Sequence, residues 1–152
     1  MQKIKIILCS LAFLLSLGLS AQSKDSAEVV LTAEKFVKAF NQFNWKVFRN
    51  SFTDDATMFH PFWEQGRRRA GRTEIEATWL EVFPEFIDSA NTETLQINPK
   101  DVHIQLYGET AIISFHLGEG IKRLSRRSLV MIKQNKEWKI AHLHASFVSA
   151  EK

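Results

Sequence analysis

Two histidines near the C-terminal end of the chain, His142 and His144, have the spacing most suggestive of chemistry. They lie two residues apart in an apolar segment, so on a β-strand their side chains point to one face, about 7 Å apart. Such a pair can ligate zinc or another transition metal if a third ligand, here His60, His103 or His116, converges on it. A two-histidine spacing specifies little. Hydrogen bonding within a packed strand is therefore the favoured interpretation, and no metal or other cofactor is expected.

A second candidate is His60, which ends an apolar segment and is followed by Pro61, Phe62 and Trp63. A histidine surrounded by aromatic side chains can act as a general base or contact a ligand. It can equally close the end of a strand beneath an apolar loop. His116 is the other histidine that we consider as a base, and Trp63 is the candidate for an aromatic pocket wall.

The chain also contains two short basic clusters. These are Arg67, Arg68, Arg69 and Arg72, and then Lys122, Arg123, Arg126 and Arg127. Basic clusters attract anionic ligands or a phosphate backbone, but with so little net charge a solvated loop is the better interpretation of the first. Arg126 and Arg127 begin a predicted strand and alternate faces, so one of them points inward or toward a partner and needs a carboxylate. The length of the following turn decides which one, and Arg127 is our candidate for the pocket.

The chain has 152 residues, of which 45% are hydrophobic, including four Trp and twelve Phe, and its formal net charge is +3. This length and composition indicate one globular domain with ample material for a core, and they exclude a disordered chain. The single cysteine excludes an intrachain disulfide.

Residues 1–21 show the three-part pattern of a secretory signal peptide, with Lys3 and Lys5, an apolar stretch, and the small Ala21 before a polar segment. A membrane anchor needs about 20 apolar residues, more than this stretch supplies. Cleavage after Ala21 leaves one domain over residues 22–152, with 18 basic against 17 acidic residues and no cysteine. We therefore expect an exported protein, periplasmic or secreted, with neither a membrane nor a nucleic acid as partner.

Hydrophobic periodicity predicts three helices in the first half of the domain. The first carries an apolar stripe over residues 29–43, Asn44 caps a short second helix, and residues 73–76 read as the capping box of a third. A strand is predicted over residues 56–62. Asp54 and Asp55 are expected to close the turn before this strand.

After residue 90 the pattern changes to the alternation of β-strands. Residues 95–97 begin a strand, and two hairpins follow, one over 102–117 and one over 126–147. Their predicted two-residue turns are Gly108-Glu109 and Asn135-Lys136. Helices followed by antiparallel strands indicate an α+β fold with the helices packed on one face of a curved sheet.

The two faces of these hairpins differ in composition. In the first hairpin, one face carries Ile104, Leu106, Ala111, Ile113 and Phe115, and the other carries His103, Gln105, Tyr107, Ile112, Ser114 and His116. In the second hairpin both faces are apolar, with Leu129, Met131, Trp138 and Ile140 against Val130, Ile132, Ala141 and Leu143. In a sheet with one solvated face, polar and apolar residues would alternate along each strand. We therefore expect a homodimer through the second face.

The segment 137–146, Glu-Trp-Lys-Ile-Ala-His-Leu-His-Ala-Ser, resembles the terminal strand of the calcium/calmodulin-dependent kinase II association domain and of SnoaL-like proteins. Residues 95–99 and 103–111 resemble the central hairpin of the same group. On these residues the chain resembles the nuclear transport factor 2-like superfamily over residues 29–146. The resemblance implies a cone-shaped fold with a pocket between the third helix and the concave sheet. Ala145 stands where the association domain has a pocket arginine, and the two-histidine motif of that domain is not a metal site.

The resemblance implies no single activity, because this fold carries enzymes, binding domains and assembly modules. We expect a SnoaL-like protein that binds an unidentified small molecule. The candidate pocket residues are His60, Trp63, Trp79, Tyr107, His116 and Arg127. One alternative is an acid–base enzyme, an isomerase, cyclase or hydratase acting on a cyclic or carbonyl compound, with His60 or His116 as base. The other is a non-catalytic homo-oligomerisation module.

Overall fold

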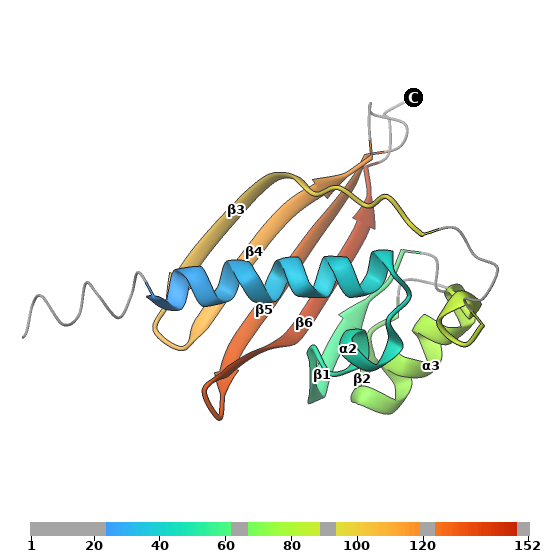
Figure 1. The fold of residues 1–152 in the computed structure, drawn as a ribbon, viewed down its shortest axis with the longest axis horizontal. Helices are drawn as coiled ribbons and strands as arrows, with labels where there is room; N and C mark the ends of the chain where they lie inside the picture. The colour runs from blue at the N-terminus through green and yellow to red at the C-terminus, as the bar shows by residue number, and fades with distance from the viewer. Residues whose placement is uncertain (1–23, 62–66, 89–93, 119–123, 149–152) are drawn as a thin grey trace, which may run out of the picture.

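The computed structural model describes residues 24–61, 67–88, 94–118 and 124–148. Within this part of the chain, the helices pack on one face of a curved, six-stranded sheet (Figure 1), which is the predicted α+β architecture. A helix over residues 24–41 comes first. It is followed by α2 (Trp45–Arg49), β1 (Phe52–Phe59), β2 (Arg69–Ala70), α3 (Arg72–Val82), a 3-10 turn (Pro84–Phe86), β3 (Lys100–Tyr107), β4 (Thr110–Leu117), β5 (Ser125–Gln134) and β6 (Glu137–Phe147).

The predicted signal peptide, residues 1–21, lies outside the described residues and stays a prediction. In the part of the chain that the structure describes, no helix is both long enough and apolar enough to cross a membrane.

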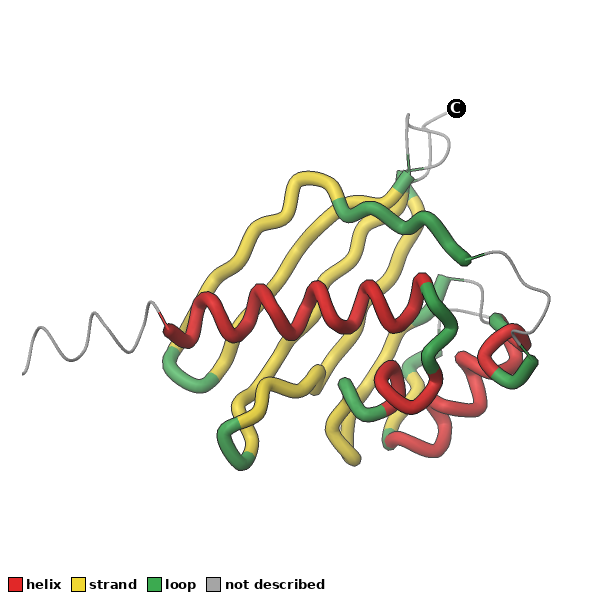
Figure 2. Tube along the Cα trace, viewed as in Figure 1, coloured by secondary structure: helices red, strands yellow, loops and turns green. Residues whose placement is uncertain are grey.

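The sheet has the strand order β2-β1-β6-β5-β4-β3. All neighbouring strands are antiparallel except β1 and β6, which run parallel. The N-terminal helix lies across the sheet, and α3 packs beside β1 at one end (Figure 2). Both two-residue hairpin turns are confirmed. Asn135 and Lys136 have φ values of 51° and 68°, as a type I′ turn requires at both central positions.

The start of α3 differs from the prediction. The helix begins at Arg72, its N-cap is Gly71, and no side chain caps it. Gly71 has a φ of 82° and donates its N–H to the carbonyl of Ala56 at 2.8 Å, so the chain turns directly from strand β2 into the helix. The predicted capping box over 73–76 is therefore wrong, and the carboxylate of Glu74 instead accepts from the N–H of Ala70 at 3.1 Å.

Strand β1 begins four residues earlier than predicted, at Phe52. Asp54 and Asp55 consequently lie within the strand, both exposed, rather than in a turn before it. The carboxylate of Asp54 forms an ion pair with Arg72 at 2.9 Å, and Arg72 also donates to the carbonyl of Phe52 at 2.9 Å. This charge pairing joins the strand to the first turn of α3.

Residues 95–97 do not form the predicted strand, because their backbone groups bond to a side chain of the N-terminal helix instead. The amide of Asn41 donates to the carbonyl of Ile97 at 3.0 Å and accepts from its N–H at 2.9 Å. The carbonyl of Asn41 also accepts from the N–H of Leu95 at 2.9 Å. This segment is therefore fastened along the C-terminal end of the helix.

A β-bulge decides which residues of β6 face the helices. Met131 pairs with Ile140, but Val130 pairs with His142, so Ala141 is an extra residue in β6. The alternation shifts by one at this point, and Leu143 joins the buried face. The expectation that Leu143 lies on the second face is therefore wrong, because period-two counting does not reveal a bulge.

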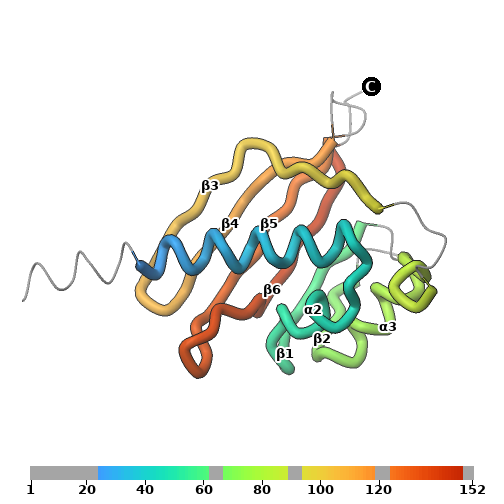
Figure 3. The backbone as a smooth tube through the Cα atoms, viewed as in Figure 1, coloured from blue at the N-terminus to red at the C-terminus, as the bar shows by residue number. Residues whose placement is uncertain are grey.

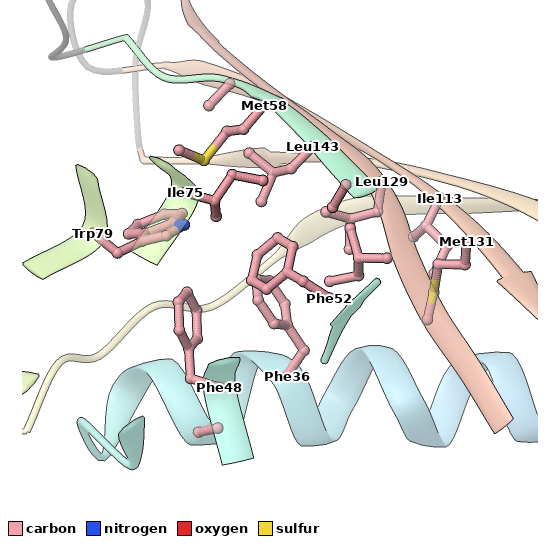
Figure 4. Packing of buried hydrophobic residues seen from close by; sticks show 14 of the residues in the cluster. Phe36, Phe48, Phe52, Met58, Ile75, Trp79, Ile113, Leu129, Met131 and Leu143 are labelled. Carbon is pink, nitrogen blue, oxygen red and sulfur yellow. The ribbon is translucent and has the colours of Figure 1, made fainter. Parts of the chain in front are cut away.

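The core lies between the helices and this buried face, and its centre is aromatic. In Figure 4, the rings of Phe36, Phe48 and Phe52 form one cluster, in which Phe48 contacts Trp79 of α3, with aliphatic side chains of the sheet nearby. The first turn of the N-terminal helix is held separately, by contacts of Lys133 on β5 with the carboxylates of Asp25 and Glu28.

Candidate ligand-binding cavity

A cavity of about 370 Å³ lies between the N-terminal helix, the end of α3 and the buried face of the sheet. Figure 3 shows the course of the N-terminal helix, α3 and the strands, which carry most of the lining residues. Its walls are mostly apolar and aromatic, and its polar side chains come from two strand ends, the end of β1 and the start of β5. The aromatic residues are Phe36, Phe40, Trp79, Phe83 and Phe115, and the polar ones are His60, Ser125 and Arg127. Of the predicted pocket residues, the structure therefore brings together His60, Trp79 and Arg127.

His60 directly follows β1, and only 4% of its surface is exposed. Its ring meets Trp79 edge to face, with a centroid distance of 4.9 Å and an interplanar angle of 84°. Burial, and secondarily the positive charge of Arg127, lower the pKa of His60 from 6.5 to about 4. The imidazole is therefore neutral at neutral pH, with one donor and one acceptor nitrogen.

Arg127 supplies the positive charge of the cavity. It lies on the buried face of β5, whereas the preceding Arg126 points to the opposite face and is exposed. Its Nη1 donates to the backbone carbonyl of Arg126 at 3.0 Å. Among the described residues, no carboxylate lies within ion-pair distance of this guanidinium. Burial lowers the pKa of Arg127, but a guanidinium stays protonated in proteins.

The strand register places Arg127 and His60 on either side of a small residue. Arg127 pairs with Ala145 on β6, and Phe59 pairs with the preceding His144. Extending this parallel register by one residue puts His60 beside Ala145. Two strand spacings, about 10 Å, then separate the backbone of Arg127 from that of His60. This arrangement explains why the charge of Arg127 reaches the His60 ring, and it places an arginine on the strand next to Ala145.

Two other predicted pocket residues, Tyr107 and His116, do not line this cavity. Tyr107 lies at the end of β3, 61% exposed, and its hydroxyl accepts from the amide of Gln105 at 3.0 Å. His116 points to the opposite face of the sheet, where its Nδ1 is 3.4 Å from the carboxylate of Asp101. Trp63 lies outside the described residues.

His142 and His144 share a face as predicted, but within the described segments no third ligand joins them. Among the described residues, no group of three His, Cys, Asp or Glu side chains could hold a metal. His142 Nδ1 instead lies 2.8 Å from the hydroxyl of Thr57, and the ring of Phe59 contacts both histidines. Burial, followed by the neighbouring His144, lowers the pKa of His142. Two of the other proposed ligands lie away from this histidine pair. His60 is on the buried face of the sheet, and His103 is on β3, three strands from β6.

The arginine-rich segment does not form one basic surface in the described chain. Arg67 and Arg68 are exposed, whereas Arg72 is paired with Asp54. In the second cluster, Lys122 and Arg123 lie outside the described residues.

Several cavity walls were not predicted as such from the sequence. Phe36 and Phe40 belong to the apolar stripe of the first helix, and Phe115 belongs to the apolar face of the central hairpin. A stripe of this kind shows that a side chain is turned inward. It does not show whether the side chain fills the core or borders an empty volume, because that depends on what packs opposite.

A larger groove of about 720 Å³ adjoins the cavity, between the N-terminal helix, residues 94–99 and β3. The two volumes share five apolar lining residues, namely Val37, Leu95, Ile97, Phe115 and Leu129. The segment fastened to Asn41 thus borders both spaces. The rim of the groove carries exposed polar residues such as Glu34 and Lys38.

Comparisons with known proteins agree with this architecture. The family model of the SnoaL-like domain matches residues 29–150, whereas a search of curated proteins found no match. Similar solved structures include a candidate dehydratase of the nuclear transport factor 2-like family from Streptomyces avermitilis, at 22% identity and a TM-score of 0.68, covering 85% of this chain and 99% of that one.

Two further structures have the same fold. A candidate ketosteroid isomerase from Shewanella frigidimarina is 27% identical with a TM-score of 0.57, covering 76% of this chain and 91% of that one. A candidate calcium/calmodulin-dependent kinase II association domain from Thiobacillus denitrificans is 18% identical with a TM-score of 0.59, and the match covers 78% of this chain and 93% of that one.

Proposed function

Because the chain belongs to the SnoaL-like domain family, we propose that it binds a small molecule in the cavity between the N-terminal helix, α3 and the sheet. The observation that carries this proposal is the cavity itself, about 370 Å³ with a mostly apolar wall that includes aromatic rings, and with a histidine and an arginine among its few polar groups. An apolar concavity with a small number of placed polar groups is the usual form of a small-molecule site.

Blocking this cavity should abolish binding without disturbing the rest of the fold. We expect a thermal-shift screen with hydrophobic and amphipathic metabolites to find compounds that raise the melting temperature of the wild type. Leu117 lies in the cavity wall and is only partly buried, so Leu117→Trp should fill the space and remove the stabilisation. Ile87→Trp, at a side chain that is 75% exposed, is the control. Equal stabilisation of both variants would contradict the proposed site.

An acid–base enzyme is less well supported by this geometry. Among the described residues, the cavity lining contains no Asp or Glu. A general base works best with a pKa near the operating pH, and the pKa of His60, at about 4, is well below that. The candidate dehydratase and ketosteroid isomerase share the fold, and a fold alone does not transfer an activity.

We also propose that the protein is a homodimer through the sheet face that the described helices leave open. This open face carries several apolar and aromatic side chains among its polar ones. They are Phe59, Ile112, Val130 and Ile132, next to Thr57, Ser114, Ser128, His142 and His144. A two-fold axis would pair this face with itself.

Light scattering of the purified protein should give the mass of two chains. Val130→Glu, in the middle of the open face, should shift it to the mass of one chain, because the interface would then bury two unpaired carboxylates. Leu31→Glu, on the exposed side of the N-terminal helix, should remain a dimer. A wild-type monomer would refute the proposed assembly.

A further inference from the structure

The guanidinium of Arg127 is an unusual component of an otherwise apolar cavity. A charge taken out of water is costly unless an opposite charge compensates it. The described residues offer only a backbone carbonyl, at 3.0 Å from Nη1. The protein therefore retains a cation beside aromatic walls that an apolar side chain of similar length would fill without this cost.

A second donor, next to the cavity wall, is also unused. Trp79 lines the cavity and is buried, and its indole Nε1 has no hydrogen-bond partner among the described residues. Buried donors are normally bonded, so one that is not calls for an explanation. Arg127 is therefore the charged donor that the described residues offer the cavity, since His60 adds no charge at neutral pH.

We propose that the ligand is an organic monocarboxylate with an aromatic body, its carboxylate bound by Arg127 and its ring packed against Phe40, Trp79 and Phe115. This inference rests on the function proposed above and specifies its ligand. A carboxylate accepts two parallel hydrogen bonds from a guanidinium, which is the strongest recognition this side chain makes. A single negative charge is favoured over a phosphate dianion, because one arginine cannot compensate two charges in an apolar enclosure.

The walls favour an aromatic rather than a purely aliphatic body. Rings gain additional stabilisation from edge-to-face and offset contacts with other rings. The wall already contains such pairs, with Phe40 and Trp79 at a centroid distance of 5.4 Å and Trp79 and Phe83 at 5.7 Å. A longer body could extend into the adjoining groove, which shares five lining residues with the cavity.

Matched acids and amides test this inference by isothermal titration calorimetry. The probes are 2-naphthoate against 2-naphthamide, and 4-phenylbutyrate against 4-phenylbutyramide, because each pair has one shape and differs in charge. We expect the wild type to bind at least one of the acids about 10-fold or more tighter than its amide, as for a charge-assisted hydrogen bond. Arg127→Met should abolish this preference and leave amide binding unchanged, and Arg127→Lys should restore part of it.

Arg126→Met is the matched control, since it removes the neighbouring arginine from the opposite face of the same strand, and it should bind like the wild type. Arg127→Met should also melt no lower than the wild type without ligand, because it removes an uncompensated charge. If the amides bind as well as the acids, or if Arg127→Met keeps the preference, the carboxylate inference fails while small-molecule binding stands. If neither the probes nor the metabolite screen reveals any binding, both proposals fail.

Discussion

Phe48→Ala should destabilise the folded protein more than any other single change considered for this molecule. Phe48 is 0% exposed, and its ring contacts six aromatic neighbours. These are Phe36, Phe40, Trp45, Phe52, Trp79 and Phe86, at centroid distances between 4.8 and 6.2 Å. Loss of a buried phenylalanine removes the transfer free energy of the ring and leaves a void, which costs about 3–5 kcal/mol.

A loss of that size is a large part of the total stability of a domain, typically about 5–15 kcal/mol. Urea unfolding followed by circular dichroism should show a strongly lowered midpoint or an unfolded variant. Ile87→Ala, which removes an apolar side chain that is 75% exposed, should change the free energy of unfolding by less than about 0.5 kcal/mol. A cost below about 1 kcal/mol for Phe48→Ala would contradict the described packing.

The second large effect is a loss of stability in mild acid, caused by His60. Its folded-state pKa of about 4 lies below the ordinary value of 6.5. The unfolded chain therefore takes up a proton at a higher pH than the folded protein does. The contribution of His60 to the free energy of unfolding is complete above pH 6.5 and is lost as the pH falls toward 4. The free energy of unfolding should drop by about 2 kcal/mol at pH 5 and by about 3 kcal/mol below pH 4.

His60→Gln should remove this part of the pH dependence, because glutamine does not titrate in this range. The measurement is the free energy of unfolding at pH 7.5 and pH 5 for both proteins. The lowered pKa of His142 acts in the same direction, so the difference between the wild type and the variant isolates His60. His103→Gln, at an exposed position on the open face, should retain the wild-type dependence. An unchanged pH profile in His60→Gln would show that the ring is not buried neutral.

Two of the polar side chains of the cavity oppose folding, Arg127 at neutral pH and His60 in mild acid. Arg127 has a charge without a carboxylate partner among the described residues, and His60 is kept neutral in a place where protonation would be costly. Neither contributes to the core that Phe48 organises. Side chains that reduce stability in this way are commonly retained for binding or catalysis, which supports placing the ligand between them.

Much of the fold follows from local patterns in the sequence. The central hairpin is set by the alternation of its side chains about Gly108 and Glu109, and the second hairpin by residues suited to positive φ at Asn135 and Lys136. The cap of α2 is equally local, since Asn44 accepts from the N–H of Val47 at 3.2 Å. These features depend on neighbours within a few residues, so the sequence alone predicts them.

The sequence, with the family resemblance, also identified His60, Trp79 and Arg127 among six pocket candidates, and it predicted that Arg126 or Arg127 turns inward or toward a partner. Only the tertiary structure decided that Arg127 is the one that turns inward, because the pairing register across β4, β5 and β6 sets the face of every side chain. The same holds for Tyr107 and His116, which the hairpin carries away from the cavity. The empty volume lies where segments far apart in the sequence, from Phe36 to Leu143, approach without filling the space, and no local pattern records such a gap.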